Sequence, residues 1–155
     1  MRQGLVGLIL GFFLASGLPI ATDELPPRFI YLTDRGLTTV TVDDILTKAT
    51  AQGAQPVITV PITKTENLSV GGAVIVGSES LHRHQHSDLV VLVWKGKGEM
   101  TLGKERLEVR KGDVILVTKG AVHKFENREA GRSVGLAVFS PPAQKGDYIE
   151  VTDEK

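Results

Sequence analysis

After Pro56 the sequence breaks into short segments rich in β-branched residues, and glycine-containing turn signals separate most of these segments. Many short strands that recur about every 8–12 residues are typical of a β-sandwich or β-barrel. The run 89–93 is apolar on both faces, which favours a strand that is covered on both sides. The segments expected to form strands are 57–63, 69–76, 89–94, 98–102, 105–110, 114–118, 121–125 and 133–139.

A short strand at 29–33 and a short helix are expected before this series. Thr41 is a typical N-cap, and the aspartates at 43 and 44 suit the positive end of the helix dipole. Gly53 is a typical stop. The helix has one apolar face, so we expect it to pack outside the main sheet; the residues of this face are Ile45, Leu46 and Ala49.

These patterns divide most of the chain into three parts. Residues 22–55 are expected to form an N-terminal extension with one short helix. Residues 56–140 are expected to form the β-barrel, and residues 141–155 a C-terminal tail or edge strand.

The first 21 residues have the pattern of a secretory signal peptide. Arg2 precedes an apolar run at 5–14, and small residues follow it, which predicts cleavage near residues 17–21. The apolar run is shorter than the roughly 20 residues that a membrane-spanning helix needs. We therefore expect a periplasmic or secreted protein; the alternative is an inner-membrane anchor formed by an uncleaved N-terminal segment.

The composition is that of one globular domain. The chain has 155 residues, of which 41% are hydrophobic and 23% are charged, and this is enough apolar material for one core. The formal net charge is zero, so the charge balance does not indicate a nucleic-acid partner. The chain has no cysteine, which excludes disulfides and thiolate metal sites.

Three of the four histidines alternate at positions 82, 84 and 86, and the fourth is His123. On an extended strand, side chains two residues apart share one face, so this run can direct several imidazoles into one space. Two imidazoles from the run and one from a distant strand would form a site for a divalent transition metal. The sequence therefore predicts a metal site built from histidines.

The region around His123 resembles the second conserved motif of the cupin superfamily. That motif reads Gly, five residues, Pro, one residue, Gly, two residues, His, three residues, Asn. Gly112, Gly120, His123 and Asn127 stand at this spacing, and Thr118 replaces the usual Pro. We interpret these glycines and the asparagine as turn residues rather than catalytic groups.

The first cupin motif, His-x-His followed by Glu and Gly, is matched less closely. If Gly96 closes the motif, His82 and His84 are the ligand positions, Leu89 stands where the family has Glu, and Asp88 comes one residue early. We favour this register and expect Asp88 or His86 as a candidate fourth ligand.

The alternative register uses His84 and His86 with Gly98 as the closing glycine, and it puts Val91 at the Glu position. Asp88 stands one residue before the Glu position of the first register, and a shift by one residue turns a side chain to the opposite face of a strand, unless a bulge restores it. Neither register places a carboxylate at the Glu position itself.

The resemblance, which covers residues 65–140, implies an all-β fold: a single cupin-type double-stranded β-helix, or jelly-roll barrel, here with a short N-terminal helix. It also implies a homodimer and one divalent transition metal (Fe, Zn, Mn, Ni or Cu) held by His82, His84 and His123. Trp94 is expected to pack in the interior or at an interface, and Phe125 to line the pocket beside His123.

Cupins include dioxygenases, decarboxylases, isomerases and lyases, so the fold does not select a reaction. The leading hypothesis is a metal-dependent, dioxygenase-like enzyme that acts on a small oxygenated molecule in the periplasm. The alternative is a non-catalytic barrel that binds or senses a small molecule or a metal. A third hypothesis is an oligomer in which the metal only stabilises the barrel.

Overall fold

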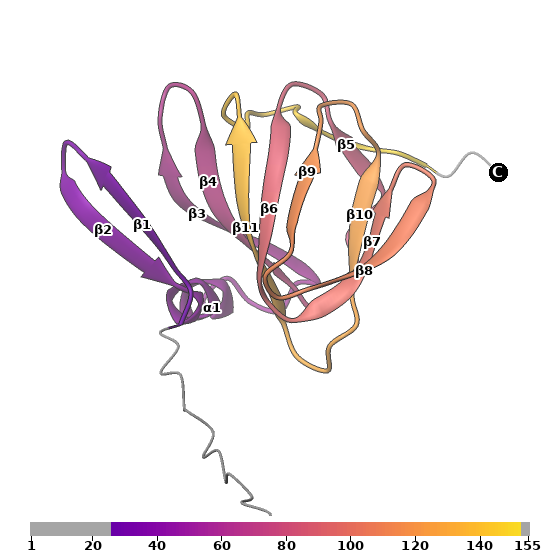
Figure 1. Ribbon diagram of the computed structural model, residues 1–155, viewed down its shortest axis with the longest axis horizontal. Coiled ribbons are helices and arrows are strands. Elements are labelled where there is room, and N and C mark those ends of the chain that lie inside the picture. The colour runs from indigo at the N-terminus through magenta and orange to yellow at the C-terminus, as the bar shows by residue number, and fades with distance from the viewer. Residues whose placement is uncertain (1–25, 153–155) are drawn as a thin grey trace, which may run out of the picture.

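A computed structural model describes residues 26–152 of the chain (Figure 1). These residues form twelve strands and one helix. In chain order the elements are β1 (Arg28–Thr33), β2 (Gly36–Thr41), α1 (Val42–Thr50), β3 (Val57–Lys64), β4 (Ser69–Ile75), β5 (His82–His84), β6 (Asp88–Lys95), β7 (Lys97–Leu102), β8 (Glu105–Arg110), β9 (Val114–Val117), β10 (His123–Asn127), β11 (Ser133–Ser140) and β12 (Tyr148–Glu150).

Two five-stranded antiparallel sheets face each other as a jelly-roll barrel, the double-stranded β-helix that the sequence predicts. One sheet has the order β12-β5-β10-β7-β8 and carries the histidines; we call it the histidine sheet. The second sheet has the order β3-β4-β11-β6-β9. After β4 each strand lies in the opposite sheet to the one before it, except β8, which pairs with β7. Segments far apart in the chain therefore become neighbours in each sheet.

The core of the barrel lies between the two sheets. Leu89 on β6, Met100 on β7 and Phe125 on β10 are among its buried side chains. Strand alternation explains this core, because every second residue of each strand points inward. On β6, Leu89 and Val93 belong to this cluster, whereas Trp94 belongs to a second one. Trp94 is therefore interior packing, as expected from the sequence.

The second apolar cluster covers the outer side of the β3–β4–β11 region, where α1 packs. Thr41 caps α1 in a capping box with Asp44, as the sequence predicts for this helix start. Ile45 and Ala49 are completely buried. Ile45 lies so close to Gly72 that a Cβ atom there would meet it at 2.6 Å, which explains why this strand position needs glycine.

The β1–β2 hairpin leans away from the barrel (Figure 1). The sequence predicts β1 but not β2, because the threonine-rich segment 36–41 lacks an apolar alternation. Phe29 and Tyr31 of β1 stack at 5.3 Å and pack against the second apolar cluster. At the tip of the hairpin, Leu32 and Leu37 remain exposed.

Within residues 26–152 no helix has the length and apolar character needed to cross a bilayer. The expected signal peptide at residues 1–21 lies outside the described residues.

Candidate metal centre

The structure brings together three of the four histidines. His82 and His84 lie on β5, and His123 opens β10, where it pairs directly with His82. One ligand nitrogen from each of these three residues lies within 4.8 Å of the others. The side chains are buried, with exposed fractions of 3%, 8% and 1%. Alternation on β5 places His82 and His84 on one face, as the sequence predicts, and sheet pairing adds His123.

Each imidazole has its Nδ1 atom next to a hydrogen-bond acceptor. His82 Nδ1 lies 2.8 Å from the Ser80 carbonyl oxygen, and His123 Nδ1 lies 3.0 Å from that of Ala121. A carbonyl oxygen can only accept, so in both rings Nδ1 carries the proton and Nε2 keeps a free lone pair. His123 Nε2 is buried and has no hydrogen-bond partner among the described residues. Such a nitrogen fits a metal ligand.

Burial also keeps these rings uncharged. Burial, together with the neighbouring His82, lowers the pKa of His123 to about 4, against the opposing effect of the hydrogen bond to the Ala121 carbonyl oxygen. It lowers the pKa values of His82 and His84 as well, against the opposing effect of their hydrogen bonds. The three imidazoles are therefore neutral at pH 7, which is the form that binds metals.

His84 is oriented by a carboxylate that the sequence did not reveal. Asp147, which precedes β12, accepts a hydrogen bond from His84 Nδ1 at 3.1 Å. It also accepts from the backbone N–H groups of His86 at 2.6 Å and Ser87 at 3.2 Å. These hydrogen bonds lower the pKa of Asp147 although burial opposes them. A carboxylate behind a metal-binding histidine fixes its tautomer and increases its basicity.

Nothing in the local pattern around Asp147 indicates this role. Asp147 lies in the tail that follows the barrel, and β12 brings it to the site by pairing with β5 through Tyr148 and His84. Tyr148 also stacks on His82, with ring centroids 4.3 Å apart.

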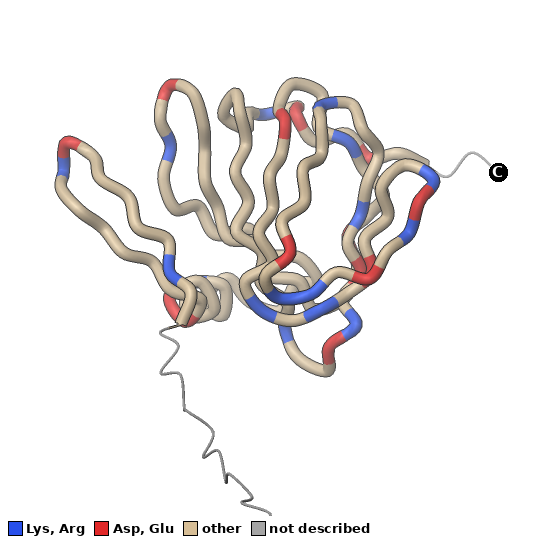
Figure 2. The backbone as a smooth tube through the Cα atoms, viewed as in Figure 1, with Lys and Arg blue, Asp and Glu red and all other residues tan. Residues whose placement is uncertain are grey.

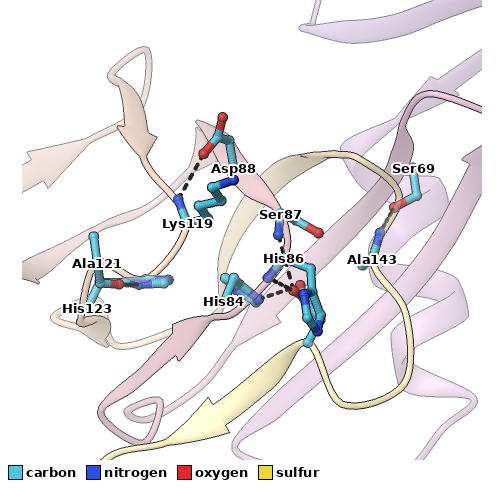
Figure 3. Close-up of polar contacts among 10 residues, drawn as sticks. Ser69, His84, His86, Ser87, Asp88, Lys119, Ala121, His123 and Ala143 are labelled. Carbon is cyan, nitrogen blue, oxygen red and sulfur yellow. Dashed lines mark hydrogen bonds and ion pairs between the residues drawn. The ribbon is translucent and has the colours of Figure 1, made fainter.

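The structure places neither candidate fourth ligand with the three imidazoles. Asp88 is exposed, and its Oδ1 accepts a hydrogen bond from the Lys119 backbone N–H at 2.8 Å; Figure 3 shows it directed toward Lys119. The His86 side chain is exposed as well. Alternation on β6 is the reason, because Leu89 faces the cavity and its neighbour Asp88 must face outward. The position of the cupin glutamate therefore does face the site, but it carries an aliphatic side chain.

A cavity of about 160 Å³ adjoins the three histidines. Most of its wall is aliphatic, and Phe125 contributes to it, as expected from its place beside His123. Glu79 is a carboxylic acid in this wall. Its Oε2 accepts a hydrogen bond from the Phe125 backbone N–H at 2.8 Å. Burial raises the pKa of Glu79 to about 7, although this hydrogen bond acts in the opposite direction.

The remaining motif residues shape turns around the site. Gly112 and Gly120 have positive φ angles of 99° and 81°, which other L-residues rarely adopt. The Gly120 N–H donates to the His84 carbonyl oxygen at 2.6 Å and thereby ties the loop before β10 to β5. The Asn127 side chain donates to three carbonyl oxygens, among them that of Gly131 at 2.7 Å. These contacts support the interpretation of these residues as turn architecture.

A two-sheet barrel with a buried cluster of three neutral imidazoles defines a jelly-roll protein with a candidate metal site. The sequence profile of the cupin domain matches residues 72–139, which include all three histidines. An uncharacterised protein of Aquifex aeolicus is 35% identical over 106 residues, which cover 68% of this chain and 87% of the relative. The chain belongs to the cupin superfamily.

Solved structures agree with this fold. An uncharacterised Klebsiella pneumoniae protein with a double-stranded β-helix domain superimposes with a TM-score of 0.57 at 18% identity, covering 65% of this chain and 89% of that one. A Lactobacillus farciminis oxalate decarboxylase superimposes with a TM-score of 0.56 at 18% identity, covering 63% of this chain and 32% of that one. At this identity the similarity shows the fold alone.

Proposed function

We propose that this protein binds one divalent transition metal through His82, His84 and His123, and that it uses the metal in an enzymatic reaction on a small oxygenated molecule. The buried His123 Nε2, which has no hydrogen-bond partner among the described residues, carries this proposal. Leaving such a nitrogen unsatisfied is costly, and a metal ion would satisfy it. Imidazole ligands suit Fe, Zn, Mn, Ni or Cu.

Two features of the cavity favour catalysis over simple storage of a metal. The metal would supply Lewis acidity next to the cavity, where an oxygen atom of a ligand can reach it. Glu79 adds a carboxyl group that changes its protonation near pH 7. A titratable group in an apolar cavity beside a metal site is typical of active sites.

The second candidate is a barrel that binds or senses a small molecule without turnover. The aliphatic cavity wall and Leu89, at the position of the cupin glutamate, favour this alternative. The oxalate decarboxylase that shares the fold indicates only that such a barrel can accommodate chemistry on a small carboxylate.

We also propose that the protein is exported and forms a homodimer. Export is supported by the apolar run near the N-terminus. The dimer is supported by an exposed apolar strip on the second sheet, composed of Val90, Val114 and Leu116. The centres of β4, β11, β6 and β9 carry no charged residue, whereas charges gather on β7 and β8 (Figure 2).

A second copy of the chain is the partner that fits this strip. The same chain presents both the strip and the exposed leucines of the β1–β2 hairpin, Leu32 and Leu37. In a dimer with two-fold symmetry, the hairpin of each copy can cover the strip of the other copy. The same contact then forms two times, and the strip and the hairpin leucines of both copies are buried.

Elemental analysis tests the metal proposal. Protein that starts at residue 22 and is purified without chelators should contain nearly one metal ion per chain. His84→Ala should lose it, whereas the matched variant His86→Ala should retain it, because His86 lies outside the cluster. Retention of metal by His84→Ala, or its absence from the reconstituted wild-type protein, would contradict the proposal.

The same measurement directs the search for an activity. Stoichiometric iron would favour the dioxygenase-like reaction, which an O₂-consumption screen on small phenols, thiols and diketones would test. A metal-loaded protein that binds such molecules without converting them would favour the binding barrel.

A further inference from the structure

Glu79 is held in the cavity by the backbone of β10. Its N–H donates to the Phe125 carbonyl oxygen at 2.9 Å, and its carboxylate accepts from the Phe125 N–H at 2.8 Å. Phe125 and the metal-site residue His123 lie two residues apart on the same face of β10. Both the glutamate and the histidine line one cavity. The glutamate is nevertheless not part of the three-histidine cluster.

The cavity limits the size and polarity of what can lie beside Glu79. Its volume of about 160 Å³ is close to that of cavities of about 150 Å³ that hold benzene. The wall is mainly aliphatic, with residues such as Val91 and Ile115. A ligand that fits has an apolar body of roughly one ring, or a short branched chain, and a polar group directed toward the histidines.

No basic side chain of the described residues pairs with Glu79 within the cavity. None of the described residues in the cavity wall is Lys or Arg. The titratable groups that share this wall are His82 and His84 from β5, His123 from β10, and Tyr148 from β12. Burial lowers the pKa values of the three histidines from 6.5 and raises that of Tyr148 from 10.0. At pH 7 to 8 the histidines are therefore neutral and the Tyr148 hydroxyl is protonated, so neither changes its protonation there.

Glu150 on β12 is the remaining charge that acts on this edge of the site, where it influences His82 and Tyr148. It is exposed and adds negative charge, so it does not stabilise an ionised Glu79. A protonated Glu79, in contrast, can donate a hydrogen bond to an anionic oxygen in the cavity, and such O–H···O⁻ bonds are short and strong.

We propose that Glu79 is the residue that selects the ligand: the cavity takes a small organic monoanion with an apolar, ring-sized body, and the Glu79 carboxylate takes up one proton from solvent when this anion binds. This inference rests on the proposed metal site, because the metal supplies the positive charge that attracts the anion. The uptake forms one O–H bond on Glu79 and leaves the ligand covalently unchanged.

Benzoate is a suitable probe, since it combines one ring with one carboxylate. Calorimetric titration of zinc-loaded protein with benzoate, in two buffers of different ionisation enthalpy, measures the protons taken up per benzoate bound. We expect uptake that approaches one proton at pH 8. We also expect the benzoate Kd to rise by about tenfold per pH unit above the pKa of Glu79.

Glu79→Gln removes the titrating proton and keeps an oxygen that can accept from the Phe125 N–H. This variant should bind the same amount of zinc, take up no proton, and lose that part of the pH dependence. Glu126→Gln is the matched control, because Glu126 is the next residue on β10 and points to the other face. It should behave like the wild-type protein.

Equal proton uptake in the wild-type protein and Glu79→Gln would overturn the proposal, and so would benzoate that fails to bind the zinc-loaded protein. The zinc content, measured separately, reports on the proposed function itself. A carbon-13 NMR titration of the Glu79 carboxyl in metal-free protein gives a test that needs no metal. A pKa near 7 supports the proposal, and one near the ordinary value of 4.5 overturns it whatever the zinc content.

Discussion

Each histidine of the candidate metal centre is oriented by a different kind of acceptor. Main-chain carbonyl oxygens hold His82 and His123, whereas the carboxylate of Asp147 holds His84. Main-chain acceptors persist when side chains are changed. Among these three acceptors, Asp147 is therefore the one that a single side-chain substitution can remove.

We expect Asp147→Asn to weaken zinc affinity by about 10- to 100-fold, as is typical when the group behind a metal-binding histidine is changed. The substitution removes the negative charge. The amide oxygen can still accept from the backbone N–H groups of His86 and Ser87, and the N–H₂ group then faces the Nδ1–H of His84, where no acceptor remains. Competition with a chromophoric chelator measures the affinity. Asp88→Asn is the control and should leave it unchanged; equal affinities for both variants would exclude a role for Asp147.

Glu79 also makes the stability of metal-free protein depend on pH. Its pKa rises from 4.5 in the unfolded chain to about 7 in the folded one, so its contribution is fully present below pH 4.5 and is lost as pH rises through 7. Glu79→Gln should therefore be more stable than the wild-type protein at pH 8, by up to about 3 kcal/mol from this shift.

Urea unfolding at several pH values checks this prediction. The difference in the free energy of unfolding should shrink as pH falls from 7 and vanish below pH 4.5. The histidines titrate in both proteins, so their contribution cancels in the difference. A difference that does not depend on pH would mean that Glu79 is ionised in the folded protein at pH 7.

At the scale of an element, the alternation of β6 decides which group the barrel offers to the metal. Leu89 is buried against the cavity, and Asp88 on the same strand points outward. A carboxylate can enter the site from β6 only on the inward-facing residues.

Leu89→Glu should therefore tighten metal binding or change the preferred metal, because it places a carboxylate beside three imidazoles. Leu89→Gln is the matched control with the same shape and no charge. Metal affinities measured by chelator competition should differ between the two variants. Identical affinity and metal preference would show that position 89 does not reach the metal.

At the scale of the whole molecule, the exposed apolar strip is the surface on which the proposed dimer depends. Light scattering coupled to gel filtration should find a dimer for the wild-type protein and a monomer for Leu116→Lys. A lysine in a buried apolar contact should raise the dimer Kd by about 30-fold or more, equivalent to about 2 kcal/mol.

Leu107→Lys is the control for the dimer prediction, because Leu107 is also an exposed apolar residue but lies on β8 of the histidine sheet. It should remain dimeric. A monomeric wild-type protein, or a Leu116→Lys variant that still dimerises with the same affinity, would place the strip outside any self-contact.

Local patterns in the sequence determine much of this protein. The turn glycines and β-branched segments predict the strands of the barrel, and Thr41 predicts the start of α1, because turn geometry and capping depend on neighbouring residues alone. The alternation of His82 and His84 likewise predicts a shared face. Because the segment around His123 resembles a cupin motif, the sequence also predicts that His123 belongs to the same metal site as the other two histidines.

Only the tertiary structure decided which side chains complete the site. Asp147 lies 63 residues after His84 and reaches it because β12 adds to the edge of the histidine sheet. Burial inside the barrel raises the pKa of Glu79. Asp88 lies outside the site because its neighbour Leu89 is the residue of β6 that faces inward. Burial and sheet-edge pairing are properties of strands brought together from distant parts of the chain, so no short stretch of sequence encodes them.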